Sequence, residues 1–256
     1  MNSKLNTRKI RSFKSKEQKL QMLTCYDYQT ARMLNETELD MILVGDSLGN
    51  VVLGYETTIS VTLNEMEVFG SAVKRGAKDK FVVVDLPFGS YNTLEQGLDN
   101  GAKLFRNTQA EALKLEGAFP YQLELIERLT QVGIPVMGHI GLTPQSVHQQ
   151  GGYYVHGKSA SSSELLIENA KKLEKAGAFA LVLECVEEKT ATQITNQISI
   201  PTIGIGAGKG VDGQVLVIND LLGLGPDKVP GFCTPMANMY QTKKELIQSY
   251  LKDGSE

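Results

Sequence analysis

The chain has 256 residues, of which 41% are apolar, and a formal net charge of −3 at pH 7. This size and composition predict a globular protein with one large core, and no Pro/Ser-rich linker divides the chain into separate domains. The slightly acidic balance argues against nucleic acid as a partner, since phosphate binding needs a basic surface.

The first nineteen residues are rich in Lys, Arg and Ser and contain no acid before Glu17. This composition occurs in organelle transit peptides, but the segment lacks the apolar block of a secretory signal. Ile10, Phe13, Glu17 and Leu20 fall at helical spacing. We therefore expect residues 1–19 to form a short amphipathic helical extension that leads into the first strand.

Short apolar runs then alternate with longer segments of helical period along the chain. Runs that are apolar throughout are typical of parallel strands buried on both faces. Eight such units in about 250 residues match the size of a (β/α)₈ barrel. A doubly wound open sheet is the rival fold, but "TCYDYQTA" follows the first strand in place of a Gly-rich turn. The eight candidate strands are "KLQMLTCY", "DMILVGDS", "KFVVVDLP", "AEALKLEG", "IPVMGHIG", "AFALVLEC", "IPTIGIGAG" and "QVLVIND".

The helices between these strands carry their own boundary signals. "SVTLNEMEVFGSAVKRGA" begins with Ser60 and Thr62 and has Glu65 in place for a capping box. "SSSELLIENAKKLEKAGA" ends at Gly177, and its Gly-Ala close resembles that of "RGA", so we expect both to stop a helix before a strand.

The last segment, residues 237–256, is predicted to be an exposed amphipathic helix and tail with a frayed end. The whole chain, residues 1–256, is then one barrel domain.

The cysteines indicate neither a disulfide framework nor a zinc site, because Cys25, Cys185 and Cys233 are far apart and lack CxxC spacing. Free cysteines favour a cytoplasmic location. The apolar runs are strand-sized, which predicts no membrane-spanning helix.

Polar side chains stand at the carboxyl ends of the predicted strands. In a parallel barrel these ends share one rim, so the residues should converge. Each has an ordinary structural alternative: an Asp after a strand often caps the next helix, and "LKLEG" can hold an ion pair. Together, however, several carboxylates at one rim need a compensating cation, and oxygen ligands select a hard ion such as Mg²⁺. The residues concerned are Asp46, Ser47, Asp85, Lys114, Glu116, His139 and Glu184.

Several motifs follow one another along the chain from about Thr24 to Gly223, among them "VGDSLG", "VVVDLPFGSY", "LKLEG", "GHIGLTPQS", "LVLECV" and "GIGAG…DGQ". In this order they resemble the motifs of the ketopantoate hydroxymethyltransferase family, also called 3-methyl-2-oxobutanoate hydroxymethyltransferase. The family loop after "GGY" usually continues with a basic residue and a Gln, where this chain has Tyr154 and His156.

The resemblance implies a (β/α)₈ barrel enzyme that transfers a one-carbon unit from 5,10-methylenetetrahydrofolate to 3-methyl-2-oxobutanoate. The product is ketopantoate, on the route to pantothenate and coenzyme A. The family uses Mg²⁺ to stabilise an enolate and forms a large homo-oligomer, a decamer.

The resemblance also implies a role for each residue at the rim. Asp46 and Asp85 ligate the metal, and Glu116 helps directly or through water. Ser47 and Lys114 hold the ketoacid, and Glu184 is the base. His139 has a positioning role or a purely structural one.

Two other functions remain open at this point. One is a metal-dependent C–C lyase of the phosphoenolpyruvate mutase/isocitrate lyase type, which uses similar enolate chemistry without folate. The other is a catalytically silent barrel that binds a ketoacid or a partner protein. The ordered set of motifs speaks against the first, and the intact set of rim residues speaks against the second.

Overall fold

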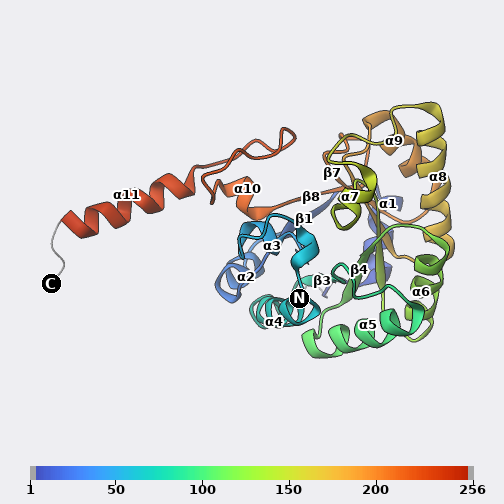
Figure 1. Cartoon of the computed structure of the whole chain (residues 1–256), viewed down its shortest axis with the longest axis horizontal. Helices are drawn as coiled ribbons and strands as arrows, with labels where there is room; N and C mark the ends of the chain where they lie inside the picture. The colour runs from blue at the N-terminus through green and yellow to red at the C-terminus, as the bar shows by residue number, and fades with distance from the viewer. Residues whose placement is uncertain (1–3, 253–256) are drawn as a thin grey trace.

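The structure is a computed structural model that describes residues 4–252, and within them eight parallel strands close into a barrel (Figure 1). The sequence prediction of a (β/α)₈ barrel is therefore confirmed, and the open-sheet alternative is wrong. Each strand pairs with the next one in the chain, and β8 returns to pair with β1. The strands are β1 (Leu20–Thr24), β2 (Met41–Val44), β3 (Phe81–Asp85), β4 (Ala112–Glu116), β5 (Val136–Gly141), β6 (Ala180–Glu184), β7 (Thr202–Ile205) and β8 (Gly213–Leu216).

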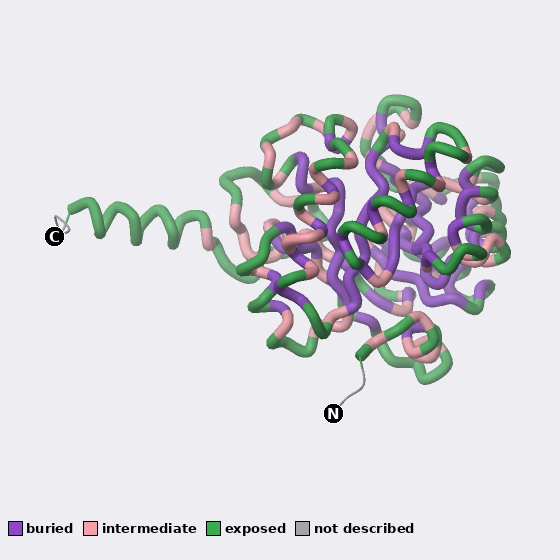
Figure 2. The backbone as a smooth tube through the Cα atoms, turned by 90° about the horizontal axis from the view of Figure 1, so that it is seen from below, coloured by how far each residue is buried: buried purple, intermediate pink, exposed green. Residues whose placement is uncertain are grey.

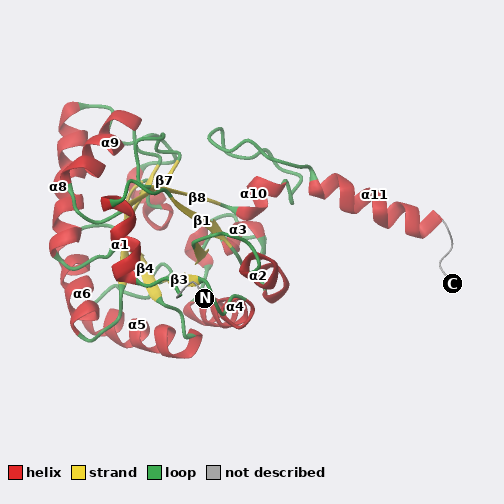
Figure 3. Cartoon of the chain, turned by 180° about the vertical axis from the view of Figure 1, so that it is seen from behind, coloured by secondary structure: helices red, strands yellow, loops and turns green. Residues whose placement is uncertain are grey.

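Helices connect the strands and surround the barrel (Figure 3). The longer helices are α1 (Thr7–Ser15), α2 (Tyr28–Asn35), α4 (Leu63–Gly76), α5 (Leu94–Thr108), α6 (Pro120–Gln131), α8 (Ala160–Lys175), α9 (Glu188–Gln197) and α11 (Met239–Lys252). The short ones are α3 (Leu48–Val51), α7 (Val147–Gln150), α10 (Ile218–Leu222) and the 3₁₀ turns η1 (Thr58–Ser60) and η2 (Pro144–Ser146).

Alternation along each strand produces two separate apolar cores. Residues such as Val82 and Val84 of β3 face outward and pack under the helices. Phe81 and Val83 of the same strand face inward and fill the barrel with their counterparts from the other strands. Because side chains alternate between the two faces of a strand, both sets must be apolar, which explains the uninterrupted apolar runs. The buried centre appears in Figure 2.

The N-terminal helix closes one end of the barrel. Asn6 caps α1 by accepting a hydrogen bond from the backbone N–H of Lys9. Ile10 is fully buried and joins the inward-facing core that contains Phe81. Lys14 forms an ion pair with Asp212, which lies just before β8. A helix is thus present in the predicted segment, and its apolar face covers the barrel at the amino ends of the strands. It is shorter than predicted, because Glu17 lies beyond its end and Leu20 is the first residue of β1, while residues 1–3 lie outside the described part of the chain.

Both predicted helices are present, as α4 and α8, although α8 begins earlier than predicted, with Ser159 as its N-cap, and one of the two glycine stops works differently. Thr62 and Glu65 form the predicted capping box at the start of α4. Gly177, after α8, adopts the left-handed φ of 104° that glycine favours. Gly76, by contrast, is the last residue of α4 itself. A Cβ there would lie 2.6 Å from the carbonyl oxygen of Tyr28, so this glycine permits close packing against α2.

The C-terminal part leaves the barrel. Residues 224–238 form an irregular segment that we call the strap, and α11 follows it and projects away from the rest of the chain (Figures 1 and 3). Every residue of α11 is exposed except Met239, which is half-buried. The predicted exposed final helix is therefore confirmed, while its predicted frayed end lies outside the described residues.

Candidate active site

The site lies directly above the inward-facing core, because side chains alternate between the two faces of each strand and the inward positions continue up to the rim. On β3 the inward positions are Phe81, Val83 and then Asp85. On β4, Ala112 is followed two residues later by Lys114, which stands beside Asp85 in the strand register. The apolar layers therefore form a floor, and the last inward position of each of these strands carries a polar group.

All seven residues singled out from the sequence line one cavity of about 190 Å³ at the carboxyl ends of the strands. The three predicted metal ligands, the lysine and the histidine are buried, whereas the side chain of Glu184 is 20% exposed. The structure thus brings the seven residues together as expected from the topology. Their individual roles remain predictions. The seven residues are Asp46, Ser47, Asp85, Lys114, Glu116, His139 and Glu184.

Asp46 and Asp85 are direct neighbours. The backbone N–H of Asp46 donates a hydrogen bond to Asp85 Oδ2 at 3.1 Å. Lys114 Nζ forms an ion pair with Asp85 Oδ1 at 3.0 Å, although this buried oxygen has no hydrogen bond of good geometry within the described residues. Within the described residues, Lys114 is therefore the charged neighbour of Asp85 Oδ1, and this oxygen can still accept a further ligand.

The carboxyl groups differ in proton affinity because their surroundings differ. Burial, and then the charges of Asp85 and Glu116, raise the pKa of Asp46 well above its usual value. Burial also raises the pKa of Asp85, against the opposing effect of Lys114. For Glu116 burial acts upward too, but the hydrogen bond and charge of His139, with Lys114, lower the pKa overall. Lys114 and the hydrogen bond from Gln145 act against this increase at Asp46 but do not cancel it.

His139 lies between two carboxylates. Its Nδ1 is 3.4 Å from Glu116 Oε1, and its Nε2 is 3.4 Å from Glu184 Oε2. Burial and the nearby Lys114 act to lower the pKa of His139, but the two glutamates outweigh them and raise it to about 9. Lys114 Nζ also lies 3.3 Å from Nδ1, and Nε2 makes no hydrogen bond of good geometry within the described residues. A protonated imidazole can donate from both nitrogens, so its Nε2 is placed to donate to Glu184 after a small shift.

Sequence reasoning did not identify Gln145, which joins two of the predicted metal ligands. Its side-chain amide donates to Asp46 Oδ2 at 2.8 Å and to the carbonyl oxygen of Leu86 at 3.0 Å. Its backbone N–H donates to Glu116 Oε2 at 3.1 Å, and the hydroxyl of Tyr91 donates to its side-chain oxygen. The motif "GHIGLTPQS" contains this residue, but a buried Gln in a turn carries no signal of its own.

Tyr26 is a second residue that the sequence did not reveal. It is buried, and its hydroxyl lies 2.8 Å from the hydroxyl oxygen of Ser47. Ser47 stands at the start of the short helix α3, directly after Asp46. The contact fixes the position of the Ser47 hydroxyl at the wall of the cavity.

The glycine-rich loop before α8 reaches the cavity as well. Tyr153 lines the cavity, and Tyr154 stacks on His156 with ring centroids 4.2 Å apart. The backbone N–H of His156 donates to the carbonyl oxygen of Cys185 at 2.7 Å, which attaches the loop to the strand end that carries Glu184. Cys185 has a φ of 48°, which is uncommon for a residue other than glycine.

The donor set suits a hard cation, but the protein supplies only part of a coordination shell. No group of three or more His, Cys, Asp or Glu in residues 4–252 forms a complete metal centre. Asp46 and Asp85, with Glu116 beside them, offer oxygen atoms only. Mg²⁺ usually binds through one or two carboxylates and takes its remaining ligands from substrate and water. Asp85 Oδ1, which can accept a ligand besides Lys114, and Asp46, whose pKa is raised by burial and by two neighbouring acids, are consistent with such a site.

A closed barrel with buried acids, a lysine and a histidine at the carboxyl ends of its strands defines the class: the chain is a (β/α)₈-barrel enzyme. A sequence profile described as ketopantoate hydroxymethyltransferase matches residues 4–256. The chain belongs to this family.

Individual relatives agree with this assignment. The chain is 50% identical over 253 residues to the 3-methyl-2-oxobutanoate hydroxymethyltransferase of Thermotoga sp. (strain RQ2), covering 98% of this chain and 93% of the relative. It is 47% identical over 248 residues to the enzyme of the same name from Halalkalibacterium halodurans, covering 96% and 88%.

Among solved structures, the fold is similar to that of more distant barrels. Phosphoenolpyruvate phosphomutase from Streptomyces platensis has a TM-score of 0.68 at 12% identity, with 98% of this chain and 88% of that chain covered. A 2,3-dimethylmalate lyase of the PEP mutase/isocitrate lyase superfamily has a TM-score of 0.66 at 14% identity, with 98% and 89% covered. At such identities the likeness concerns the fold alone.

Proposed function

We propose that the chain transfers a one-carbon unit from 5,10-methylenetetrahydrofolate to 3-methyl-2-oxobutanoate and so produces ketopantoate. The observation that carries this proposal is the family membership over residues 4–256, together with one cavity lined by all the rim acids. The net reaction consumes one water molecule, forms one carbon–carbon bond at C3 of the ketoacid and releases tetrahydrofolate. The reaction requires removal of the C3 proton, which is only weakly acidic.

The residues divide this work according to their positions. Lys114, held beside Asp85, offsets the negative charge of the ketoacid, and the hydroxyl of Ser47 donates a hydrogen bond to its carboxylate. Glu184 is the base that takes the C3 proton, since it is the least buried of the acids and stands on β6, apart from Asp46 and Asp85. His139 positions Glu184 through its Nε2.

Asp46 and Asp85, with Glu116 nearby, are the residues that would hold a divalent ion, for which we propose Mg²⁺. Such an ion, when bound, polarises the keto group of the substrate and makes the neighbouring C–H more acidic. Its positive charge also balances Asp46, whose carboxylate is buried and lies next to two others.

The test is proton exchange at C3 of 3-methyl-2-oxobutanoate, followed by NMR in D₂O. The expected result is Mg²⁺-dependent loss of the C3 proton signal by the purified protein, and ketopantoate formation when 5,10-methylenetetrahydrofolate is added. No exchange by the intact protein would contradict the proposal. Cleavage of a 2,3-dimethylmalate-type substrate without folate would instead identify a lyase.

We further propose that the protein is a homo-oligomer in which α11 packs on a second copy. The exposed apolar residues Leu246, Ile247, Tyr250 and Leu251 lie on this helix, which projects away from its own barrel (Figure 1). A cavity of about 460 Å³ along the outer side of β1 and β8 is lined by residues that include Leu23, Leu39 and Leu216. Each chain therefore offers both an apolar helix and an apolar groove, so α11 of each copy can pack in the groove of another copy.

Light scattering tests this assembly. A chain truncated after residue 238 should form an assembly of fewer subunits than the full chain at the same concentration, and an unchanged number of subunits would refute the role of α11.

The structure has no helix within residues 4–252 that is long and apolar enough to cross a membrane. We place the protein in the cytoplasm, because its three cysteines are free thiols.

A further inference from the structure

The central cavity is too small for both substrates of the proposed reaction. Its volume is about 190 Å³, and its walls are the acids, the lysine and the histidine of the rim. Pockets that enclose a ligand of the size of a reduced folate measure about 300–1,000 Å³. The small ketoacid and an ion suit the central cavity, so most of the folate must bind outside it.

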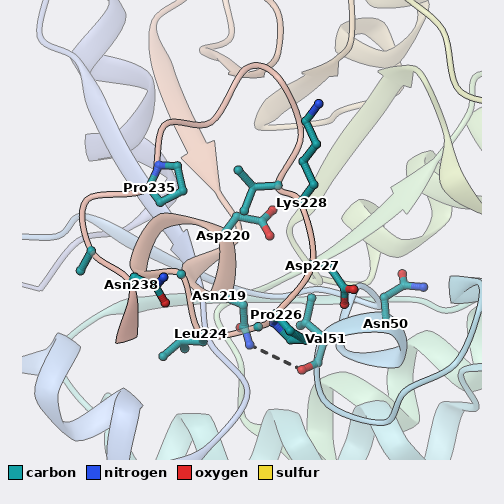
Figure 4. Close-up of a pocket in the computed structure, with 14 residues that line it drawn as sticks. Asn50, Val51, Asn219, Asp220, Leu224, Pro226, Asp227, Lys228, Pro235 and Asn238 are labelled. Carbon is teal, nitrogen blue, oxygen red and sulfur yellow. Dashed lines mark hydrogen bonds between the residues drawn. The ribbon is translucent and has the colours of Figure 1, made fainter. Parts of the chain in front are cut away.

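A second cavity of about 670 Å³ lies next to the first. Its walls are α3, α10 and the strap, and Asn50 of α3 lines both cavities. Figure 4 shows Asn50, Val51 and Asn219 side by side at its base, where the amide of Asn219 donates to the carbonyl oxygen of Val51 at 3.5 Å. The two cavities therefore adjoin at Asn50, which lies three positions after Ser47.

Asp220 is the distinctive group of this second cavity. It belongs to α10 and is half-buried, and its carboxylate points into the space that the strap encloses (Figure 4). Within the described part of the chain, no hydrogen bond or ion pair reaches this carboxylate. Burial raises the pKa of Asp220, because the carboxylate lacks a partner that would stabilise its charge.

We propose that the cavity between α3, α10 and the strap binds the pterin ring of the reduced folate, with Asp220 pairing with the ring's amino-pyrimidinone edge. This inference rests on the proposed function and identifies where the second substrate binds. The edge presents two adjacent N–H donors, which match the two oxygens of a carboxylate. The amides of Asn219 and Asn238 line the same cavity and can serve the remaining polar atoms of the ring.

The other end of a folate carries one or more carboxylates. Lys228 stands on the strap at the wall of the cavity and is exposed, so it can pair with these charges at the surface. With the ring beside Asp220, the one-carbon unit next to the ring faces Asn50 and the central cavity. The cavities between α6 and α8 and beside α4 and α5 share no lining residue with the central cavity.

The first experiment measures tetrahydrofolate binding and proton exchange with the same full-length protein. Asp220→Asn keeps the shape of the side chain and removes its charge, so the Kd for tetrahydrofolate should rise about tenfold or more. Exchange at C3 of the ketoacid, which reports the central cavity alone, should stay within about twofold. The control, Asp99→Asn on the exposed face of α5, should change neither quantity.

A second experiment does not depend on any change at Asp220. The chain contains no tryptophan, so a single tryptophan is a specific fluorescent reporter. Pro235→Trp places it at an exposed position on the wall of the second cavity, and Val132→Trp places it at the exposed end of α6 as a control. Tetrahydrofolate should quench the first reporter saturably and leave the second unchanged.

The outcomes separate this inference from the proposed function. If the intact protein exchanges the ketoacid proton and forms ketopantoate, but Asp220→Asn binds tetrahydrofolate as tightly as the intact protein, the pterin assignment is wrong and the function stands. Equal responses of the two tryptophan reporters would also refute it. If the intact protein shows no exchange, the proposed function fails first.

Discussion

Replacing Gln145 by Met tests whether the amide network organises the proposed metal ligands. Met has a similar length and volume but offers no hydrogen bonds of useful strength. The change removes the bonds to Asp46 and Leu86 and the one received from Tyr91, all of them buried. The backbone bond from residue 145 to Glu116 is kept.

The expected loss of stability follows from the groups that become unsatisfied. Two are neutral and one is a carboxylate, so the free energy of unfolding should fall by roughly 3–5 kcal/mol. The pKa of Asp46 should rise further, because the bond from Gln145 acts to lower it. A carboxylate that binds a proton more tightly competes less well for a cation, and loss of such supporting bonds typically costs about 10–100-fold in metal affinity.

The assay is the Mg²⁺ concentration needed for half-maximal exchange of the ketoacid C3 proton, with urea unfolding measured in parallel. Gln150→Met is the matched control, since Gln150 lies close by and donates to Gly141 and Thr143 without touching a carboxylate. It should lower stability but leave the Mg²⁺ requirement unchanged. If both variants shift the Mg²⁺ requirement equally, or neither does, the reasoning about Gln145 is refuted.

Three further predictions concern the base, the histidine and the N-terminal helix. Glu184→Gln should slow C3 exchange by about 10²–10⁴-fold while ketoacid binding, measured by calorimetry, changes little; exchange at the normal rate would remove Glu184 as the base. The pKa of His139 is raised to about 9 from an ordinary value of 6.5, so its protonated ring should stabilise the fold fully below about pH 6.5 and lose this effect as the pH rises through about 9. Urea unfolding without divalent ions should therefore show a decline in stability between these values that His139→Gln abolishes, and identical slopes would contradict the charged state. Ile10→Ala should lower the free energy of unfolding by about 2–5 kcal/mol, because Ile10 is fully buried in the barrel core; a change below about 1 kcal/mol would mean that α1 is not part of that core.

Much of the fold was predictable because local patterns and global topology agree. Continuous apolar runs are required on strands buried on both faces, and eight of them fix the barrel. The position of Asp85 at the end of such a run also indicated the rim, since the ends of parallel strands meet there. The capping box of Thr62 and Glu65 was readable because both partners lie within one turn.

Contacts between distant segments were not predictable from one sequence. Gln145 and Asp46 are 99 positions apart, and neither the spacing nor the residue type of Gln145 indicates that they bond. The contact between Tyr26 and Ser47 is of the same kind. At Gly76 the sequence did carry a signal, but the interpretation was wrong. A glycine at a helix end suggests a stop, whereas Gly76 permits close packing against α2. Only the arrangement of neighbouring elements distinguishes these cases.

The N-terminal helix covers the barrel at the amino ends of the strands, opposite the cavity that the rim acids line. Inward-facing side chains such as Phe81 fill the space between that helix and the acids. If the folate binds beside the cavity as we propose, it stands in the way of the smaller ketoacid. The proposal then predicts an ordered reaction, in which the ketoacid binds before the folate and tetrahydrofolate leaves before ketopantoate.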